Sequence, residues 1–178
     1  MAVTREAELG RRLRTIQNAF GAILGPQDAW LLLRGIKTLA VRLEAQQRTA
    51  TAVAAWLRQR PQVRRICYPG LADHPGSAVH AGQASGPGAV VSFELADRAT
   101  AVDFLKRVRL PLVAVSLGGV ESILSYPSTM SHAAMPPAER LARGISDGLI
   151  RFSAGLEAAE DLTADFSAAF EQMTDLRV

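Results

Sequence analysis

The spacing of the apolar residues changes at Pro61, and this change limits the folds that the chain can adopt. Before Pro61, apolar side chains recur every three or four positions, which is typical of amphipathic helices. The first such series is Leu9, Leu13, Ile16 and Phe20. After Pro61, short apolar runs alternate with segments that contain glycine and proline, which is typical of strands and turns. The pattern predicts a long helical arm over residues 1–60 and a separate domain over residues 61–178.

Four short apolar runs in the second part have the composition of β-strands. They cover residues 63–68, 89–95, 112–115 and 149–153. Helices are predicted over 99–108 and 160–176, and residues 69–88 are predicted to be a long polar loop. Strands and helices joined by long connections favour an α+β fold. We expect an α/β sandwich, in which a small sheet is covered by helices on one side.

The composition excludes several classes of protein. The chain has 178 residues, 48% of them hydrophobic, which is enough for one sizeable core. Its 20 basic and 17 acidic residues give a net charge of only +3. The basic residues are not interleaved with aromatic residues, so we expect no nucleic-acid binding. No run of about 18 apolar residues occurs, so we expect no contact with a membrane. The single cysteine, Cys67, excludes an internal disulfide and indicates a cytoplasmic protein.

Motifs for a metal or a catalytic nucleophile are weak. His74, His80 and Cys67 match no spacing of zinc ligands, so we predict no metal site. Ser131 and His132 are adjacent, but the sequence around them lacks the turn that exposes a nucleophilic serine. We therefore interpret each histidine as a loop or structural residue.

The segment 115–122 favours a ligand site. It is a sharp turn between apolar runs, and glycines such as Gly118 and Gly119 let a backbone approach a ligand closely. Ser116 would present its hydroxyl at the edge of the sheet, with Leu117 in the supporting turn.

Arg151 is the second unusual feature, because it interrupts an apolar strand. An arginine among apolar neighbours needs an anionic partner, and its planar guanidinium suits a carboxylate. Two interpretations stay open: a site for the carboxylate of a small molecule, or an ion pair within the chain. The candidates for such an ion pair are Glu121, Asp147 and Glu157.

Several ordered motifs resemble one known family. Residues 116–122, 130–137 and 144–157 are similar to the carboxyl-terminal end of the transsulfuration enzymes, and 24–39 and 69–76 fit the same pattern. That family comprises the cystathionine β-lyases, γ-lyases and γ-synthases and the methionine γ-lyases, which use pyridoxal 5'-phosphate (PLP). The resemblance covers essentially the whole chain. It implies the carboxyl-terminal domain of a fold-type I PLP-dependent transferase, preceded by a long helical arm.

The resemblance also implies roles for individual residues. The serine matching Ser116 lies beside the cofactor-bound lysine and the substrate, and the arginine matching Arg151 grips the α-carboxylate of the substrate. Together they would orient an amino acid for loss of the proton at Cα. The cofactor would act as the electron sink.

The residue before Ser116 distinguishes the subclasses of the family. The γ-synthases and γ-lyases typically have glutamate there, whereas this chain has Val115, as β-lyases and methionine γ-lyases do. Gly119 departs from the methionine γ-lyase pattern, which tends to have aspartate after the first glycine. We expect a cystathionine β-lyase, which converts cystathionine to homocysteine, pyruvate and ammonia. A γ-synthase, a γ-lyase and a methionine γ-lyase are the alternatives.

The family's Schiff-base lysine and its main PLP-binding residues belong upstream of the region that this chain matches. Neither Lys37 nor Lys106 lies in a context that replaces that lysine. We therefore expect the chain to be inactive alone, as a fragment, a split subunit or a shortened reading frame. It would need a complementary amino-terminal half, or would associate with itself through residues 5–40, as the family's homotetramers suggest. A non-enzymatic alternative is an inert folded domain or an assembly module.

Overall fold

The computed structural model describes residues 2–174, and helices fill its first third, as the apolar spacing predicts. The chain divides into two compact units, Met1–Ala40 and Val41–Val178. The first unit contains α1 (Ala7–Phe20) and α2 (Pro26–Ile36). Neither helix buries a residue, so their apolar side chains are exposed along both helices.

Helix α3 (Leu39–Leu57) begins where the two units divide, and its second half belongs to the core of the second unit. Its small and branched side chains Ala50, Val53 and Leu57 are fully buried there. The units consequently divide near residue 40, whereas the sequence pattern places the boundary near residue 60.

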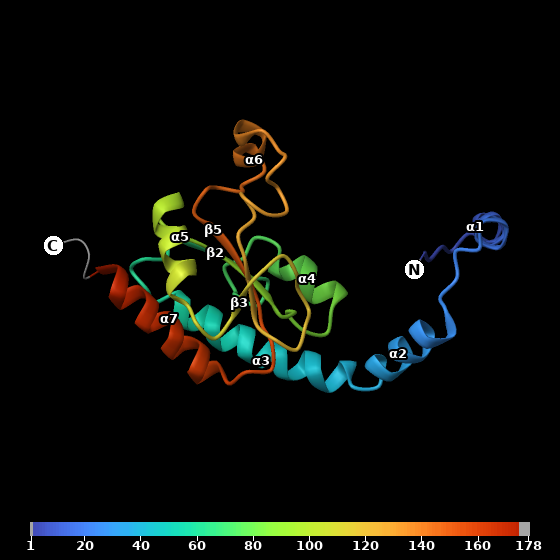
Figure 1. The fold of residues 1–178 in the computed structure, drawn as a ribbon, viewed down its shortest axis with the longest axis horizontal. Coiled ribbons are helices and arrows are strands. Elements are labelled where there is room, and N and C mark those ends of the chain that lie inside the picture. Colours follow the sequence, from blue (N-terminus) through green and yellow to red (C-terminus); the bar gives the residue numbers. More distant parts are fainter. Residues whose placement is uncertain (1, 175–178) are drawn as a thin grey trace. The chain divides into compact units, whose positions relative to one another are not determined.

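The second unit is built on a five-stranded sheet with the strand order β1-β2-β5-β4-β3. Strands β2 and β5 of this sheet lie side by side (Figure 1). The strands are β1 (Arg65–Cys67), β2 (Val90–Glu94), β3 (Leu112–Val113), β4 (Ile123–Ser125) and β5 (Leu149–Ser153). Strands β3 and β4 are parallel and the other neighbours are antiparallel. The long strand β5 therefore lies in the middle of the sheet.

Two elements differ from the sequence prediction. Strand β4 was not predicted, because its three residues follow a glycine turn and are too few to show an alternating pattern. The segment 69–88 is not a continuous loop, since α4 (Ser77–Gln83) lies within it. This helix is only seven residues long, and its serine, glycine and histidine are weak helix formers. The predicted helix 160–176 is α7 (Ala159–Thr174), and its predicted end lies outside the described residues.

Alternation along the strands gives the sheet two different faces. Val91 and Phe93 of β2 lie opposite Phe152 and Ile150 of β5, and all four are fully buried. Helices α3, α5 (Arg98–Arg107) and α7 cover this face and supply the rest of the core. The expected α+β sandwich with helices on one side of the sheet is thus confirmed. The short α6 (Pro137–Ala142) lies between β4 and β5 in the chain.

Phe104 of α5 is the centre of the core. Its ring stacks on Phe170 of α7, with centroids 4.8 Å apart, and meets Phe93 of the sheet edge-on at 5.8 Å. Phe166 approaches it at 5.5 Å. Such aromatic pairs contribute about 0.5–1.5 kcal/mol each beyond the burial of their area. They hold α5 and α7 against one face of the sheet. The other face of the sheet is not part of this aromatic core.

A pH effect follows from Tyr68, which is fully buried. Burial raises the pKa of its phenol above 10.0, and the hydrogen bond with Thr51 opposes this only in part. A raised folded-state pKa contributes stability that is complete below pH 10.0 and is lost as the pH rises through the folded pKa. We expect the melting temperature to fall above that pH, and to fall less steeply in Tyr68→Phe. Thermal melts followed by circular dichroism would measure both slopes. Parallel slopes in the two proteins would contradict this assignment, whatever the offset at pH 7.

Candidate functional site

Arg151 lies on the face of the sheet that α3, α5 and α7 do not cover. It follows Ile150 and precedes Phe152, both of which point into the core, so alternation turns Arg151 to the opposite side. Its neighbours across the strands are Ser92 of β2 and Ser125 of β4. The three side chains form one row on a polar face.

The guanidinium of Arg151 is held by neutral oxygen atoms. Its Nη2 donates to the carbonyl oxygen of Ser116 at 2.9 Å and to Oγ of Ser125 at 3.0 Å. Its Nε–H is buried and has no acceptor among the described residues. A buried donor without a partner costs about 1–3 kcal/mol, and more when the group is charged, unless a ligand satisfies it.

The proposed ion pair of Arg151 within the chain is wrong. Asp147 pairs with Arg140 instead, and both carboxylate oxygens of Glu157 are bound by Ser122. Among the described residues no carboxylate, that of Glu121 included, forms a salt bridge with Arg151. The charge of Arg151 is therefore not paired with a described carboxylate of this chain.

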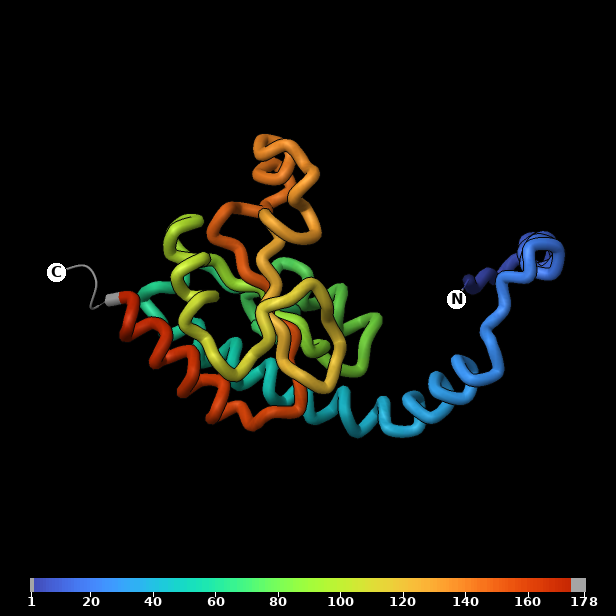
Figure 2. Tube along the Cα trace, in the orientation of Figure 1, coloured from blue at the N-terminus to red at the C-terminus, as the bar shows by residue number. Residues whose placement is uncertain are grey.

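The turn over residues 115–122 connects β3 to β4 (Figure 2). Hydrogen bonds to other residues of the chain hold its backbone. The amide of Gly118 donates to Oγ of Ser153 at 2.9 Å. The carbonyl oxygen of Gly119 accepts from Nε2 of Gln46 on α3 at 2.6 Å. Gly118 has a φ of +74°, a conformation that strongly favours glycine. The sharp turn predicted over this segment thus depends on glycine at position 118.

Glu157 closes the base of the turn. Its Oε1 accepts from the amide of Ser122 and its Oε2 from the hydroxyl of Ser122, each at 2.8 Å. The same hydroxyl accepts from the amide of Gly155 at 2.8 Å. A Cβ on Gly155 would collide with the backbone of Glu121 and Ser122, so the end of β5 approaches the turn as closely as glycine permits. These contacts lock the turn to the strand that carries Arg151.

The structure brings Ser116 and Arg151 together through the carbonyl group of Ser116, while the serine residue is exposed. The side chains of Val115 and Leu117 on either side are 66% and 54% exposed. Apolar side chains therefore flank the polar groups of the site.

Supporting residues were missed at the sequence level. They are Gln46, Ser122, Ser125 and Ser153, while Glu157 was considered only as a partner of Arg151. Gln46 and Gly119 are 73 positions apart, so no local pattern signals their contact.

The remaining candidates of the sequence analysis have structural roles. His74 accepts from the amide of Gly76, and His80 contacts the carbonyl oxygen of Gly86. Oγ of Ser131 lies 2.9 Å from the ring of His132, an exposed contact between neighbours. Within residues 2–174, no three histidine, cysteine or acidic residues are grouped to hold a metal ion, and no helix is long and apolar enough to cross a membrane.

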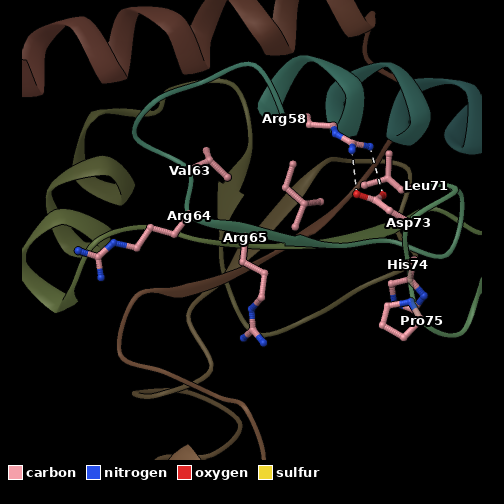
Figure 3. A pocket seen from close by; sticks show the side chains of 9 residues that line it. Arg58, Val63, Arg64, Arg65, Leu71, Asp73, His74 and Pro75 are labelled. Atoms are coloured by element: carbon pink, nitrogen blue, oxygen red, sulfur yellow. Dashed lines mark hydrogen bonds and ion pairs between the residues drawn. The ribbon is translucent and has the colours of Figure 1, made fainter.

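A separate hollow of about 270 Å³ lies beside β1 and the end of α3 (Figure 3). Arg58 and Asp73 reach toward each other across it and form two hydrogen bonds of 3.1 and 2.8 Å. Arg64 points away from this pair, and Arg65 binds Glu94. Because the chain's own carboxylates already neutralise Arg58 and Arg65, this hollow has weaker features of an anion site than Arg151.

Comparison with known proteins identifies the family of the chain. The sequence model of the Cys/Met metabolism PLP-dependent enzyme family matches residues 1–171. The chain belongs to this family. The resemblance inferred from its motifs is thus confirmed at the level of the family.

Relatives within the family match nearly all of the chain. It is 53% identical to the cystathionine β-lyase MetC of Bacillus subtilis over 178 residues, which is 100% of this chain and 46% of that protein. It is 44% identical to the cystathionine γ-lyase of the same organism, over 97% of this chain and 46% of that one. The crystal structure of cystathionine γ-synthase from Xanthomonas oryzae pv. oryzae in complex with cystathionine matches with a TM-score of 0.91 and 45% identity, over 97% of this chain and 45% of that chain. The chain therefore spans somewhat less than half the length of these relatives.

The chain has two lysines, and neither lies on β5 or in the turn over residues 115–122. PLP enzymes bind their cofactor through a lysine amine. Lys106 lies on α5, which covers the opposite face of the sheet from Arg151. Lys37 lies at the end of α2 in the first unit. No lysine is among the described residues that form hydrogen bonds with Arg151 or hold the turn.

Proposed function

We propose that this chain supplies the substrate-binding side of a PLP-dependent carbon–sulfur lyase, and that Arg151 binds the α-carboxylate of the substrate. The observation that supports this most is the guanidinium itself. It lies on the open face of the sheet, Nη2 is held in place, and the buried Nε–H has no acceptor among the described residues. A carboxylate oxygen would satisfy that donor with a charge-assisted hydrogen bond.

The proteins that resemble this chain support an amino acid as the ligand. One solved relative is a γ-synthase in complex with cystathionine, and another is a γ-lyase of Lactobacillus plantarum complexed with L-serine. Both ligands carry an α-carboxylate. Binding that group at Arg151 would fix the Cα of the substrate near the exposed Ser116, which would orient the Cα–H bond for proton removal.

Within this function we propose β-lyase chemistry, in which cystathionine and water give homocysteine, pyruvate and ammonia. Val115 supports it, since an exposed apolar side chain beside Ser116 cannot pair with the distal ammonium of cystathionine. The 53% identity with a cystathionine β-lyase points the same way. The 44% identity with a γ-lyase keeps γ-lyase or γ-synthase chemistry as the second candidate.

The lysine that binds PLP would come from a complementary amino-terminal half in the cytoplasm, and the chain alone would not be an active enzyme. Lys106 supports this proposal, because it lies on α5, which covers the opposite face of the sheet from Arg151. An inert folded domain or an assembly module is the corresponding non-enzymatic function for the chain by itself.

The role of Arg151 can be tested in a chimera in which these 178 residues replace the matching segment of the Bacillus subtilis β-lyase. We expect Arg151→Ala to raise the KM for cystathionine roughly 30-fold or more, because losing a buried charge-assisted contact costs about 2–4 kcal/mol. Arg64→Ala is the matched control, since its exposed side chain points away from the Arg58–Asp73 pair. An unchanged KM in Arg151→Ala would remove the proposed role.

The absence of cofactor binding can be tested on the chain itself. After addition of PLP, borohydride reduction and desalting, we expect no absorbance from a reduced cofactor and no mass increase on Lys37 or Lys106. A control with the intact Bacillus subtilis enzyme should retain the label. A stoichiometric label on either lysine, accompanied by lyase turnover, would show that the chain is an enzyme alone.

The exposed apolar residues of the first unit predict self-association. Ile16, Trp30 and Leu33 are all more than half exposed, and contiguous apolar surface of this kind drives association. We expect light scattering at roughly tens of micromolar to detect dimers or larger species. The pair Ile16→Glu and Leu33→Glu should shift them toward monomer, whereas Arg12→Glu on the same unit should not. A monodisperse monomer of the unchanged chain would contradict this.

A further inference from the structure

Ser125 lies where β4, β5 and the turn 115–122 meet. It is 3% exposed and stands directly opposite Arg151 in the antiparallel pair of β4 and β5. Its Oγ can donate to the carbonyl oxygen of Ala114 at 2.7 Å or, at a longer 3.3 Å, to that of Ser116. It accepts from Nη2 of Arg151 at 3.0 Å. One hydroxyl therefore links the guanidinium to the backbone that enters the turn.

We propose that Ser125 is a positioning residue, which fixes the guanidinium of Arg151 relative to the turn that carries Val115 and Ser116. This inference rests on the proposed role of Arg151 and adds the device that orients it. A serine hydroxyl has a single hydrogen. When that hydrogen is donated to Ala114, the lone pairs of Oγ remain to accept from Arg151.

The pattern of contacts at the guanidinium supports a fixed orientation. Nη2 carries two hydrogens, and the structure gives it two acceptors, the carbonyl oxygen of Ser116 and Oγ of Ser125. Two acceptors at one nitrogen define the plane of the guanidinium. The Nε–H, which is buried and has no acceptor among the described residues, then has an orientation that is set before a ligand arrives.

The other serine in the row provides a natural comparison. Ser92 of β2 lies opposite Arg151 on the second side, as Ser125 does on the first. The hydrogen bonds of Arg151 go to Ser116 and Ser125. Two serines thus flank the same arginine in one cross-strand row, and Ser125 is the one bonded to it.

The test is nuclear magnetic resonance of the Arg151 Nε–H in the full chain, with the signal assigned by its loss in Arg151→Lys. In Ser125→Ala we expect its exchange with water to become about tenfold faster, because a guanidinium that loses a hydrogen bond to a buried acceptor moves more freely. Ser125→Thr, which keeps the hydroxyl, should restore slow exchange. Ser92→Ala should leave the rate unchanged, and melting temperatures would show that every variant is folded.

Equal exchange rates in the unchanged chain, Ser125→Ala and Ser92→Ala would overturn the inference. If Ser125→Ala does not fold, Ser125→Cys tests the same point, since a thiol of similar size is a much weaker hydrogen-bonding group. Rapid exchange in Ser125→Cys supports the proposal, and slow exchange overturns it.

Kinetics in the chimera separate this inference from the proposed function. We expect Ser125→Ala to raise the KM for cystathionine about fivefold or more, with a smaller change in kcat. If Arg151→Ala raises KM but Ser125→Ala changes neither KM nor the exchange rate, the positioning role alone fails. If Arg151→Ala leaves KM unchanged, the proposed function fails, and the exchange experiment still decides whether Ser125 holds the guanidinium.

Discussion

The alternation of side chains along β5 is the constraint on which both the core and the site depend. Ile150 and Phe152 must point toward the helices, because they pack with Phe93, Phe166 and the other residues of the core. Arg151 between them is then obliged to point the other way. A slip of one residue in the register of β5 would bury the charge and expose two large apolar side chains. The packing of the core thus determines the side of the sheet on which Arg151 lies.

The polar face is held together by a few hydrogen bonds between distant parts of the chain. Glu157 fixes the base of the turn through Ser122, and Gln46 and Ser153 fix its tip. These donors and acceptors satisfy one another, which is what low-dielectric surroundings require of buried polar groups. The Nε–H of Arg151 is one of several buried polar groups without a partner among the described residues, and those of Arg60 and Arg140 are others. Arg151 differs from these two in its place, because its Nη2 is held by Oγ of Ser125 and by the carbonyl oxygen of Ser116 in the glycine turn.

The sequence alone revealed unusual positions where one residue differs in chemical character from its immediate neighbours. Arg151 could be predicted, since a charge inside an apolar strand is visible within five residues, and the glycines of the turn were visible for the same reason. The partners of Arg151 could not be predicted. Ser125 is 26 positions away in a strand of three residues, and only the pairing of β4 with β5 brings it near. Glu157 was considered as an ion-pair partner from its proximity in sequence, but its carboxylate binds the amide and hydroxyl of Ser122 instead.

The groups that would recognise a substrate are therefore separable from those that would perform chemistry on it. Every contact that orients Arg151 and the turn comes from the second unit, through α3, the sheet and the segment after β5. The exposed Val115, Leu117 and Val120 surround these polar groups with apolar surface. Each such side chain gains about 1.5–3 kcal/mol when it is covered completely. A body that covered this turn would both bury those side chains and exclude water from Arg151, which strengthens a charge-assisted hydrogen bond. In the proposed function, closure of the site and affinity for the carboxylate would thus be consequences of the same contact.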